Sequence, residues 1–231
     1  MDTHYLYLAI NIGSVFVPFL ASFYPKHAFY KHWKSYFIAN SIVALFFIVW
    51  DMIFTHIGVW GFNYNYLLGI KIYNLPIEEI MFFFFIPYSS TFIWYSMLYL
   101  VKKCPLENYH KAITTFLLGF SFVVAIINYE RFYTFYTSLF FFIFLAVIYW
   151  KKVNMGYIYF GYIITLLPFL IVNGILTGSW IDEPVVWYNN NENLGKRIAT
   201  IPDEDAFYGF VMVAATIVLF QSIEKKPLLA R

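Results

Sequence analysis

Seven long apolar runs alternate with polar connections along the chain. The runs cover residues 5–24, 33–54, 80–100, 112–128, 132–150, 155–172 and 207–223. Most of them match the ~20 residues with which an α-helix crosses a bilayer, and the fourth is one of the two shortest. Two connections are much longer than the others, residues 56–79 and 173–205. This pattern predicts an all-α integral membrane protein with seven transmembrane helices.

Composition agrees with a membrane setting and argues against several kinds of site. Apolar residues make up 61% of the 231 residues and charged residues only 12%, about half the charge of an ordinary soluble domain. A single cysteine, Cys104, cannot form an internal disulfide, and the five histidines do not have metal-ligand spacing. The chain has no glycine-rich nucleotide loop, and the seventh run has no lysine for a retinal Schiff base. We therefore expect no metal and no cofactor, and because the net charge is only +2, we expect no nucleic-acid partner.

The cations are distributed unequally between the two sides of this seven-helix plan. Four lie on one side, Lys71, Arg131, Lys196 and Arg197; eleven lie on the other, Lys26, Lys31, Lys34, Lys102, Lys103, Lys111, Lys151, Lys152, Lys225, Lys226 and Arg231. The positive-inside rule then predicts an outer N-terminus and a cytoplasmic C-terminus. No basic segment precedes the first run, so we expect it to be a transmembrane helix and not a cleaved signal peptide.

A gapless internal repeat relates the two halves of the chain with a constant offset of 126. Matched pairs include Asn63 and Asn189, Gly69 and Gly195, Pro76 and Pro202, Glu78 and Glu204, and Glu79 and Asp205. The offset carries helices one to three onto helices five to seven and leaves helix four as a linker. We expect two parallel three-helix repeats, residues 1–104 and 105–231 with the linker in the second, related by a pseudo-twofold axis along the membrane normal.

The repeated motif places two adjacent acids at the start of a hydrophobic helix. Such acids can simply stabilise a helix N-terminus, but a carboxylic acid in an apolar pocket also resists ionisation and can donate a proton near neutral pH. Adjacent helical positions point about 100° apart. We expect Glu78 and Glu204 to face a shared cavity, with Glu79 and Asp205 as their partners. Asp51 is a further candidate, because an ionisable residue within a span is rare.

Aromatic side chains close to these acids suggest a site for an apolar or cationic species. Aromatic faces attract cations, including a carbocation formed in a dry pocket. Most rings in so aromatic a chain only pack or face lipid. We nevertheless take six residues as candidates for substrate binding: Trp60, Phe62, Phe82, Trp187, Tyr188 and Asn173.

Six motifs in this order resemble the membrane lycopene cyclases of the heterodimeric bacterial and fungal fused type. They are Trp50-Asp51, GVWGFN at 58–63, PIEE at 76–79, NGILTG at 173–178, PVVWY at 184–188 and PDED at 202–205. The resemblance implies an isomerase, an intramolecular lyase, that cyclises the ends of lycopene or a related linear carotene. It implies acid/base chemistry without net redox change and without a flavin site.

Carried onto the matching positions, the resemblance assigns Glu78 and Glu204 to proton transfer, with Glu79, Asp205 and Asp51 as partners. Asp203 departs from the pattern, because an apolar residue is expected there. The product is expected to carry β rings. The protein is expected to lie in a bacterial cytoplasmic membrane, where other carotenoid-pathway enzymes are possible partners. Two alternatives remain open at this point: a transporter with a carboxylate site for protons or cations, and an assembly subunit of another membrane enzyme.

Overall fold

The computed structural model describes residues 3–225 and Leu228. Lys226 and Arg231, two of the cations counted above, lie outside the described residues. The predicted helices are confirmed, since seven helices in the described part are long and apolar enough to cross a membrane. They are α1 (Leu6–Ala21), α2 (Trp33–His56), α3 (Ile77–Leu100), α4 (His110–Ile127), α5 (Phe132–Trp150), α6 (Gly156–Leu176) and α7 (Asp203–Ile223).

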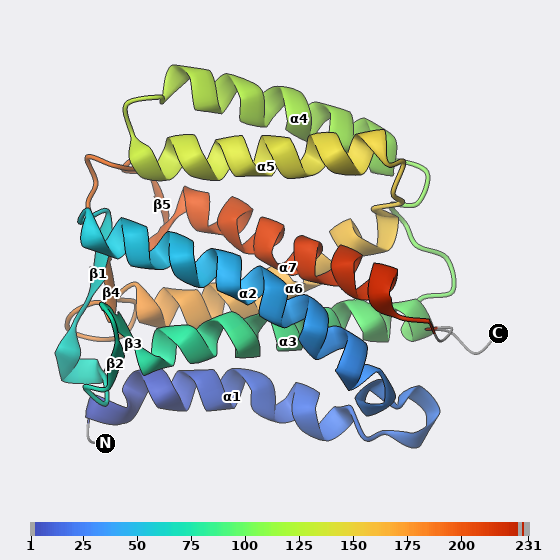
Figure 1. The fold of residues 1–231 in the computed structure, drawn as a ribbon, viewed down its shortest axis with the longest axis horizontal. Helices are drawn as coiled ribbons and strands as arrows, with labels where there is room; N and C mark the ends of the chain where they lie inside the picture. Colours follow the sequence, from blue (N-terminus) through green and yellow to red (C-terminus); the bar gives the residue numbers. More distant parts are fainter. Residues whose placement is uncertain (1–2, 226–227, 229–231) are drawn as a thin grey trace.

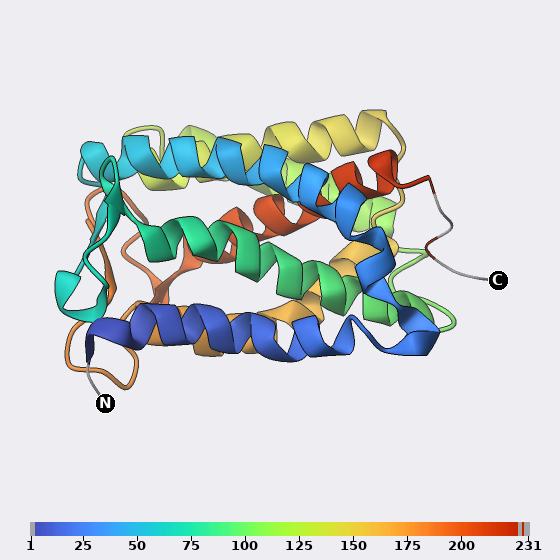
Figure 2. The same ribbon diagram turned by 60° about the horizontal axis from the view of Figure 1, so that its bottom comes forward.

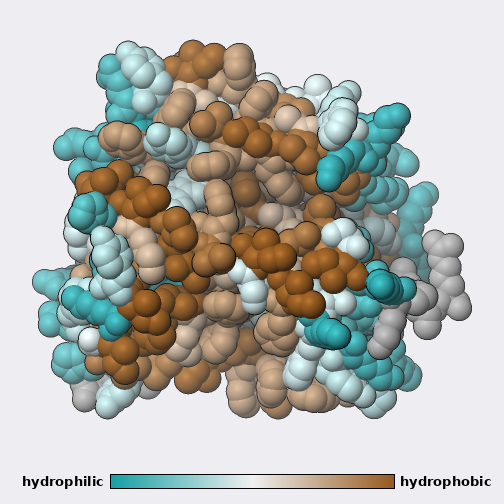
Figure 3. All heavy atoms as spheres, in the orientation of Figure 1, coloured by the Kyte–Doolittle hydropathy of each residue, from teal (hydrophilic) through white to brown (hydrophobic). Residues whose placement is uncertain are grey.

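The helices run side by side and form a bundle with an apolar outer surface. Hydrophobic residues form a belt around the middle of the visible face, and hydrophilic residues gather at its two ends (Figure 3). Large apolar side chains project outward, among them Leu45, Phe116 and Leu167, each with at least 65% of its surface exposed. Lipid would cover these side chains, which is the arrangement a bilayer requires.

The contacts between helices are arranged symmetrically with respect to the two halves of the chain. α1 packs against α3, and α5 packs against α7; likewise α2 packs against α7, and α6 against α3. α4 lies on the outer side of α5 (Figures 1 and 2). Each contact has its counterpart when α1, α2 and α3 are exchanged with α5, α6 and α7. Helix α4 has no equivalent in this comparison.

Six short strands, which the sequence pattern did not predict, organise the two long connections. β1 (Trp60–Phe62) pairs antiparallel with β4 (Val186–Tyr188), so that Trp60 lies opposite Tyr188. Two tight hairpins precede the acidic motifs: β2 (Lys71–Ile72) with β3 (Leu75–Pro76), and β5 (Arg197–Ile198) with β6 (Ile201–Pro202). All the strands that Figure 1 labels lie at one end of the bundle, next to the N-terminus, and the C-terminus lies at the other end.

The pairing of β1 with β4 ties the two halves together at one close contact. A Cβ atom on Gly61 would collide with the indole ring of Trp187, so only glycine fits at this position without a shift of that ring. The two long connections are therefore held against each other by backbone hydrogen bonds and by this ring, and together they cover the end of the bundle.

Candidate active site

A cavity of about 120 Å³ lies inside the bundle, beneath the β1–β4 pair. Its wall comes mainly from α3, α6 and α7, with smaller contributions from α1, α2, α5 and the two strands. Most lining residues are apolar or aromatic. Among the described residues that line it, none is a lysine, arginine or histidine.

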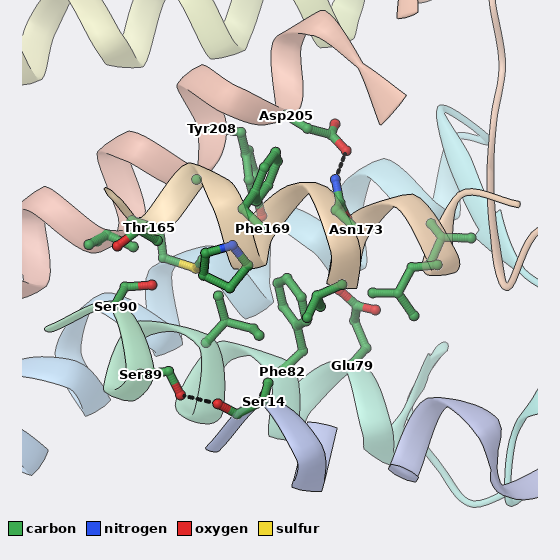
Figure 4. Close-up of a pocket in the computed structure, with 18 of the residues that line it drawn as sticks. Ser14, Glu79, Phe82, Ser89, Ser90, Thr165, Phe169, Asn173, Asp205 and Tyr208 are labelled. Atoms are coloured by element: carbon green, nitrogen blue, oxygen red, sulfur yellow. Dashed lines mark hydrogen bonds between the residues drawn. The ribbon is translucent and has the colours of Figure 1, made fainter. Parts of the chain in front are cut away.

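Three acids from three different helices meet at the strand-covered end of this cavity. They are Asp51 of α2, Glu79 of α3 and Asp205 of α7, and none has more than 9% of its surface exposed. Figure 4 shows Glu79 and Asp205 approaching the cavity from opposite sides, with Asn173 of α6 between them. The tertiary structure thus brings together acids that are up to 154 residues apart, since 205 − 51 = 154.

Each of these acids is held by hydrogen-bond donors. The Tyr7 hydroxyl donates to Oε2 of Glu79 at 2.6 Å. Asp205 accepts bonds from Tyr133, from Asn173 Nδ2 at 2.6 Å and from the Tyr188 hydroxyl at 3.1 Å. These contacts fix the direction of each carboxyl group, which acid/base catalysis requires.

Asp51 is only partly satisfied by its neighbours. Its Oδ1 accepts the indole N–H of Trp60 and, at 3.3 Å, the hydroxyl of Thr55. Its Oδ2 is buried and has no hydrogen-bond partner among the residues that the structure describes. An unpartnered buried carboxyl oxygen is costly. Oε2 of Glu78 and Oε2 of Glu204 are also buried without a partner among the described residues, but only Asp51 of these three acids lines the cavity, where its Oδ2 can accept a proton.

The expected orientation within each acidic pair is wrong. Glu78 and Glu204 are buried but do not line the cavity. Oε1 of Glu78 accepts the backbone N–H of Leu68 at 2.6 Å, and Oε1 of Glu204 accepts that of Leu194 at 2.7 Å. Each long connection folds back over the start of its helix, so the second helical residue meets the loop.

The third residue of each helix, Glu79 or Asp205, is rotated by about 100° from the second and therefore faces the interior. Asp203, the departure from the family pattern, is the first residue of α7 and lies outside the cavity wall. The repeat thus has one structural acid and one cavity-facing acid in each half.

Five of the six predicted substrate-binding residues line the cavity: Trp60, Phe62, Phe82, Tyr188 and Asn173. Trp187 does not. Alternate residues of a strand point to opposite faces, so Val186 and Tyr188 face the cavity, while Trp187 lies over Gly61 with 44% of its surface exposed.

Sequence reasoning missed the tyrosines that surround the acids. Tyr7 and Tyr133 are 126 positions apart and bind the equivalent acids Glu79 and Asp205, so the repeat offset could have identified them. The ring centroids of Tyr133 and Tyr188 are 5.7 Å apart, and Trp60 lies 5.1 Å from Tyr133. Tyr208 completes this aromatic cluster at 6.3 Å from both Trp60 and Tyr133.

Electrostatics keep the Tyr188 hydroxyl in its donor form. Burial, and next the charge of Asp205, raise the pKa of the Tyr188 phenol well above its usual value. The phenol therefore stays protonated and donates to Asp205.

Among the described residues, no group of His, Cys, Asp or Glu side chains is arranged to hold a metal ion.

A comparison with protein families finds one that accounts for most of the chain. A family model described as lycopene cyclase matches residues 4–98 and 130–223. The matched segments begin 126 residues apart, since 130 − 4 = 126, which is the offset of the internal repeat, and α4 lies outside both. No curated protein and no solved structure matches the chain.

Proposed function

The chain belongs to the lycopene cyclase family, and from this premise we propose that it closes the ends of lycopene into β rings by acid/base catalysis at Asp51, Glu79 and Asp205. Enzymes of this family act on a carotene within a membrane, and the seven apolar helices provide that setting. The observation that carries the proposal is the meeting of three buried acids at one end of an apolar cavity.

Proton balance supports this assignment. Three neighbouring buried carboxyl groups, with no cation among the described residues around them, cannot all be charged without a large desolvation and repulsion cost. At least one therefore holds a proton. We assign that proton to Glu79, because it accepts only one hydrogen bond, from Tyr7, whereas Asp51 accepts two and Asp205 three, and each donor favours the ionised form.

The reaction itself needs one proton to enter and one to leave. The carboxylic acid of Glu79 protonates the terminal double bond of the carotene end and becomes a carboxylate. The inner double bond attacks the resulting tertiary cation and closes the ring, which moves the positive charge onto a ring carbon. Asp51, through its unpartnered Oδ2, removes a proton from the ring. The product is an isomer of the substrate, so the step requires no oxidant or reductant.

The aromatic cluster and Asp205 stabilise the carbocation between protonation of the double bond and removal of the ring proton. Trp60, Tyr188 and Tyr208 present ring faces and edges at the acidic end of the cavity, and a desolvated cation over an aromatic face gains about 2 kcal/mol. Asp205, held by three donors, serves as the counter-ion. Asn173 orients Asp205 and in this way contributes to the site without touching the reacting carbons.

The experiment that tests the proposal is expression in a host that accumulates lycopene. We expect a colour shift, and chromatography should resolve carotenes with β-ionone ends. Carotenes with ε or γ rings would correct the ring assignment only. Unchanged lycopene, in cells whose membranes contain the folded protein, would refute cyclisation and return the transporter to consideration.

A further inference from the structure

The cavity continues from the acids toward the middle of the bundle. Glu79 and Ile93 of α3 both line it, and fourteen helical residues span about 21 Å. Ser14 of α1 faces α6 across the cavity, where Pro168 and Val172 form part of the wall, and all three side chains are at least partly exposed. These residues place a partly exposed stretch of the cavity wall between α1 and α6, which we call the α1–α6 groove.

The polar side chains along this groove do not oppose a hydrocarbon ligand. Ser89 donates to the backbone carbonyls of Ser14 and Phe85, each at 2.9 Å, and Figure 4 shows the first of these bonds. Thr165 donates to the carbonyl of Gly161 at 3.0 Å. Their hydroxyl groups are thus satisfied by the helices, and what remains toward the groove is small and largely apolar.

At four of these wall positions the other half has much larger side chains, although Thr165 and Ser89 correspond to the smaller Ala39 and Ala215. With the offset of 126, Ser14 corresponds to Phe140 of α5, while Val172, Asn173 and Leu176 of α6 correspond to residues of α2. These residues are Phe46, Phe47 and Trp50, so four aromatic rings replace one serine, one valine, one asparagine and one leucine.

These four rings fill the space between α2, α5 and α7. Phe140 lies 4.6 Å from Trp50 and 5.3 Å from Phe46 between ring centroids. Tyr208 of α7 lies 4.9 Å from Phe47 and 5.2 Å from Trp50. The cluster is continuous from the lipid-facing Phe46, which is 46% exposed, to the wall of the cavity at Tyr208.

We propose that the carotene enters from lipid through the α1–α6 groove alone, because aromatic side chains close the equivalent α2–α5 groove, so that the protein holds one carotene end at a time. This inference rests on the proposed function and specifies how the substrate reaches the acids. Two acid-bearing halves thus form a single site with a single access route. A carotene that is cyclised at both ends must leave and return with its other end.

The test is to close the α1–α6 groove with the aromatic side chains that close the α2–α5 groove. Ser14→Phe and Val172→Phe introduce the residues found at positions 140 and 46, one on each wall. Ile12→Phe is the matched control, because Ile12 lies on the same helix as Ser14, is 48% exposed and does not line the cavity. Initial rates of lycopene cyclisation in membranes are measured together with the amount of folded protein.

We expect Ser14→Phe and Val172→Phe to lower the rate at least about tenfold. A phenyl ring in the groove should keep the carotene end from reaching its reactive position, and misplacement of a substrate has effects of this size or larger. Ile12→Phe should stay close to the unmodified protein. Normal rates in either groove variant would overturn the inference while leaving cyclisation intact. If one variant does not accumulate as folded protein, the other decides.

Product analysis provides a second arm. With lycopene in large excess, the first product released should be monocyclic. Doubly cyclised carotene, formed from the earliest time points without a free monocyclic species, would contradict occupation by one end at a time. Inactivity of the unmodified protein would instead refute the proposed function, so the two failures are distinguishable.

Discussion

Tyr7 of α1 donates a hydrogen bond to Glu79 of α3 at 2.6 Å, across 72 residues of chain. Tyr133 and Asp205 repeat this bond with the same separation in the second half. The two tyrosines therefore set the direction of the two repeated acids that face the cavity.

Removing either tyrosine hydroxyl should slow cyclisation without removing the ring. We expect Tyr7→Phe and Tyr133→Phe to lower the rate roughly ten- to hundredfold. Tyr133 bonds the Asp205 carboxylate, and Tyr7 bonds the carboxylate that Glu79 becomes as it gives up its proton. A hydrogen bond to a charged group contributes about 1.5–3 kcal/mol. Initial rates with saturating lycopene measure this. Tyr129→Phe, at an exposed tyrosine, is the control and should have no effect. Unchanged rates in both variants would show that the hydroxyls do not position the acids.

The two acids of each motif should respond differently to amide substitution. Glu79→Gln and Asp205→Asn leave size unchanged but remove a proton donor and a charge, and we expect losses of at least about a hundredfold. Glu78→Gln and Glu204→Gln keep an oxygen that can accept from Leu68 and Leu194, so most activity should remain. The reverse order of effects, measured by product chromatography, would restore the assignment based on sequence alone.

Tyr188 provides a prediction about pH. Because its pKa is raised above the usual value near 10, the phenol keeps its proton from roughly pH 6 to 9. Tyr188→Phe should lower the rate by a constant factor across this range, since the lost donor is present at every pH in the unmodified enzyme. A ratio of rates that changes with pH would mean that Tyr188 titrates during the reaction.

Gly61 should be essential for stability and not for chemistry. Its replacement by alanine places a methyl group against the Trp187 indole, and overpacking of this kind costs about 1–3 kcal/mol. We expect Gly61→Ala to lower the thermal unfolding midpoint in detergent. Gly119→Ala in α4, where an added Cβ meets nothing within 4 Å, should leave the midpoint unchanged or raise it.

Membrane orientation can be checked with single cysteines. The cation distribution predicts that Asn191 lies outside and Lys103 inside, and both are exposed. In intact cells, a thiol reagent that cannot cross the membrane should label Asn191→Cys and spare Lys103→Cys, with Cys104 buried in both. The opposite pattern would invert the topology and place the acids at the cytoplasmic side.

Several features follow from the sequence alone because they depend on local composition and spacing. Seven apolar runs of bilayer length require seven helices, since every backbone polar group in lipid must be paired within its own segment. The offset that relates Pro76-Ile77-Glu78-Glu79 to Pro202-Asp203-Glu204-Asp205 is equally a property of the chain. The offset identified both acidic motifs. Asp51 was identified separately, as an ionisable residue within a span, and together these residues include all three acids that line the cavity. The two-repeat arrangement with its axis stays a prediction, supported by the matching helix pairs.

Only the tertiary structure decided which acid of each pair faces the cavity. Glu78 and Glu79 differ by one step of a helix, and the choice between them depends on where the long connection folds back, which spacing does not reveal. The same applies to Trp187 and Tyr188, which strand pairing sends to opposite sides. It applies as well to the two grooves, which the repeat makes equivalent, while contacts among Trp50, Phe140 and Tyr208 close one of them. Periodicity specifies which residues share a segment, but long-range packing determines which of their faces meet.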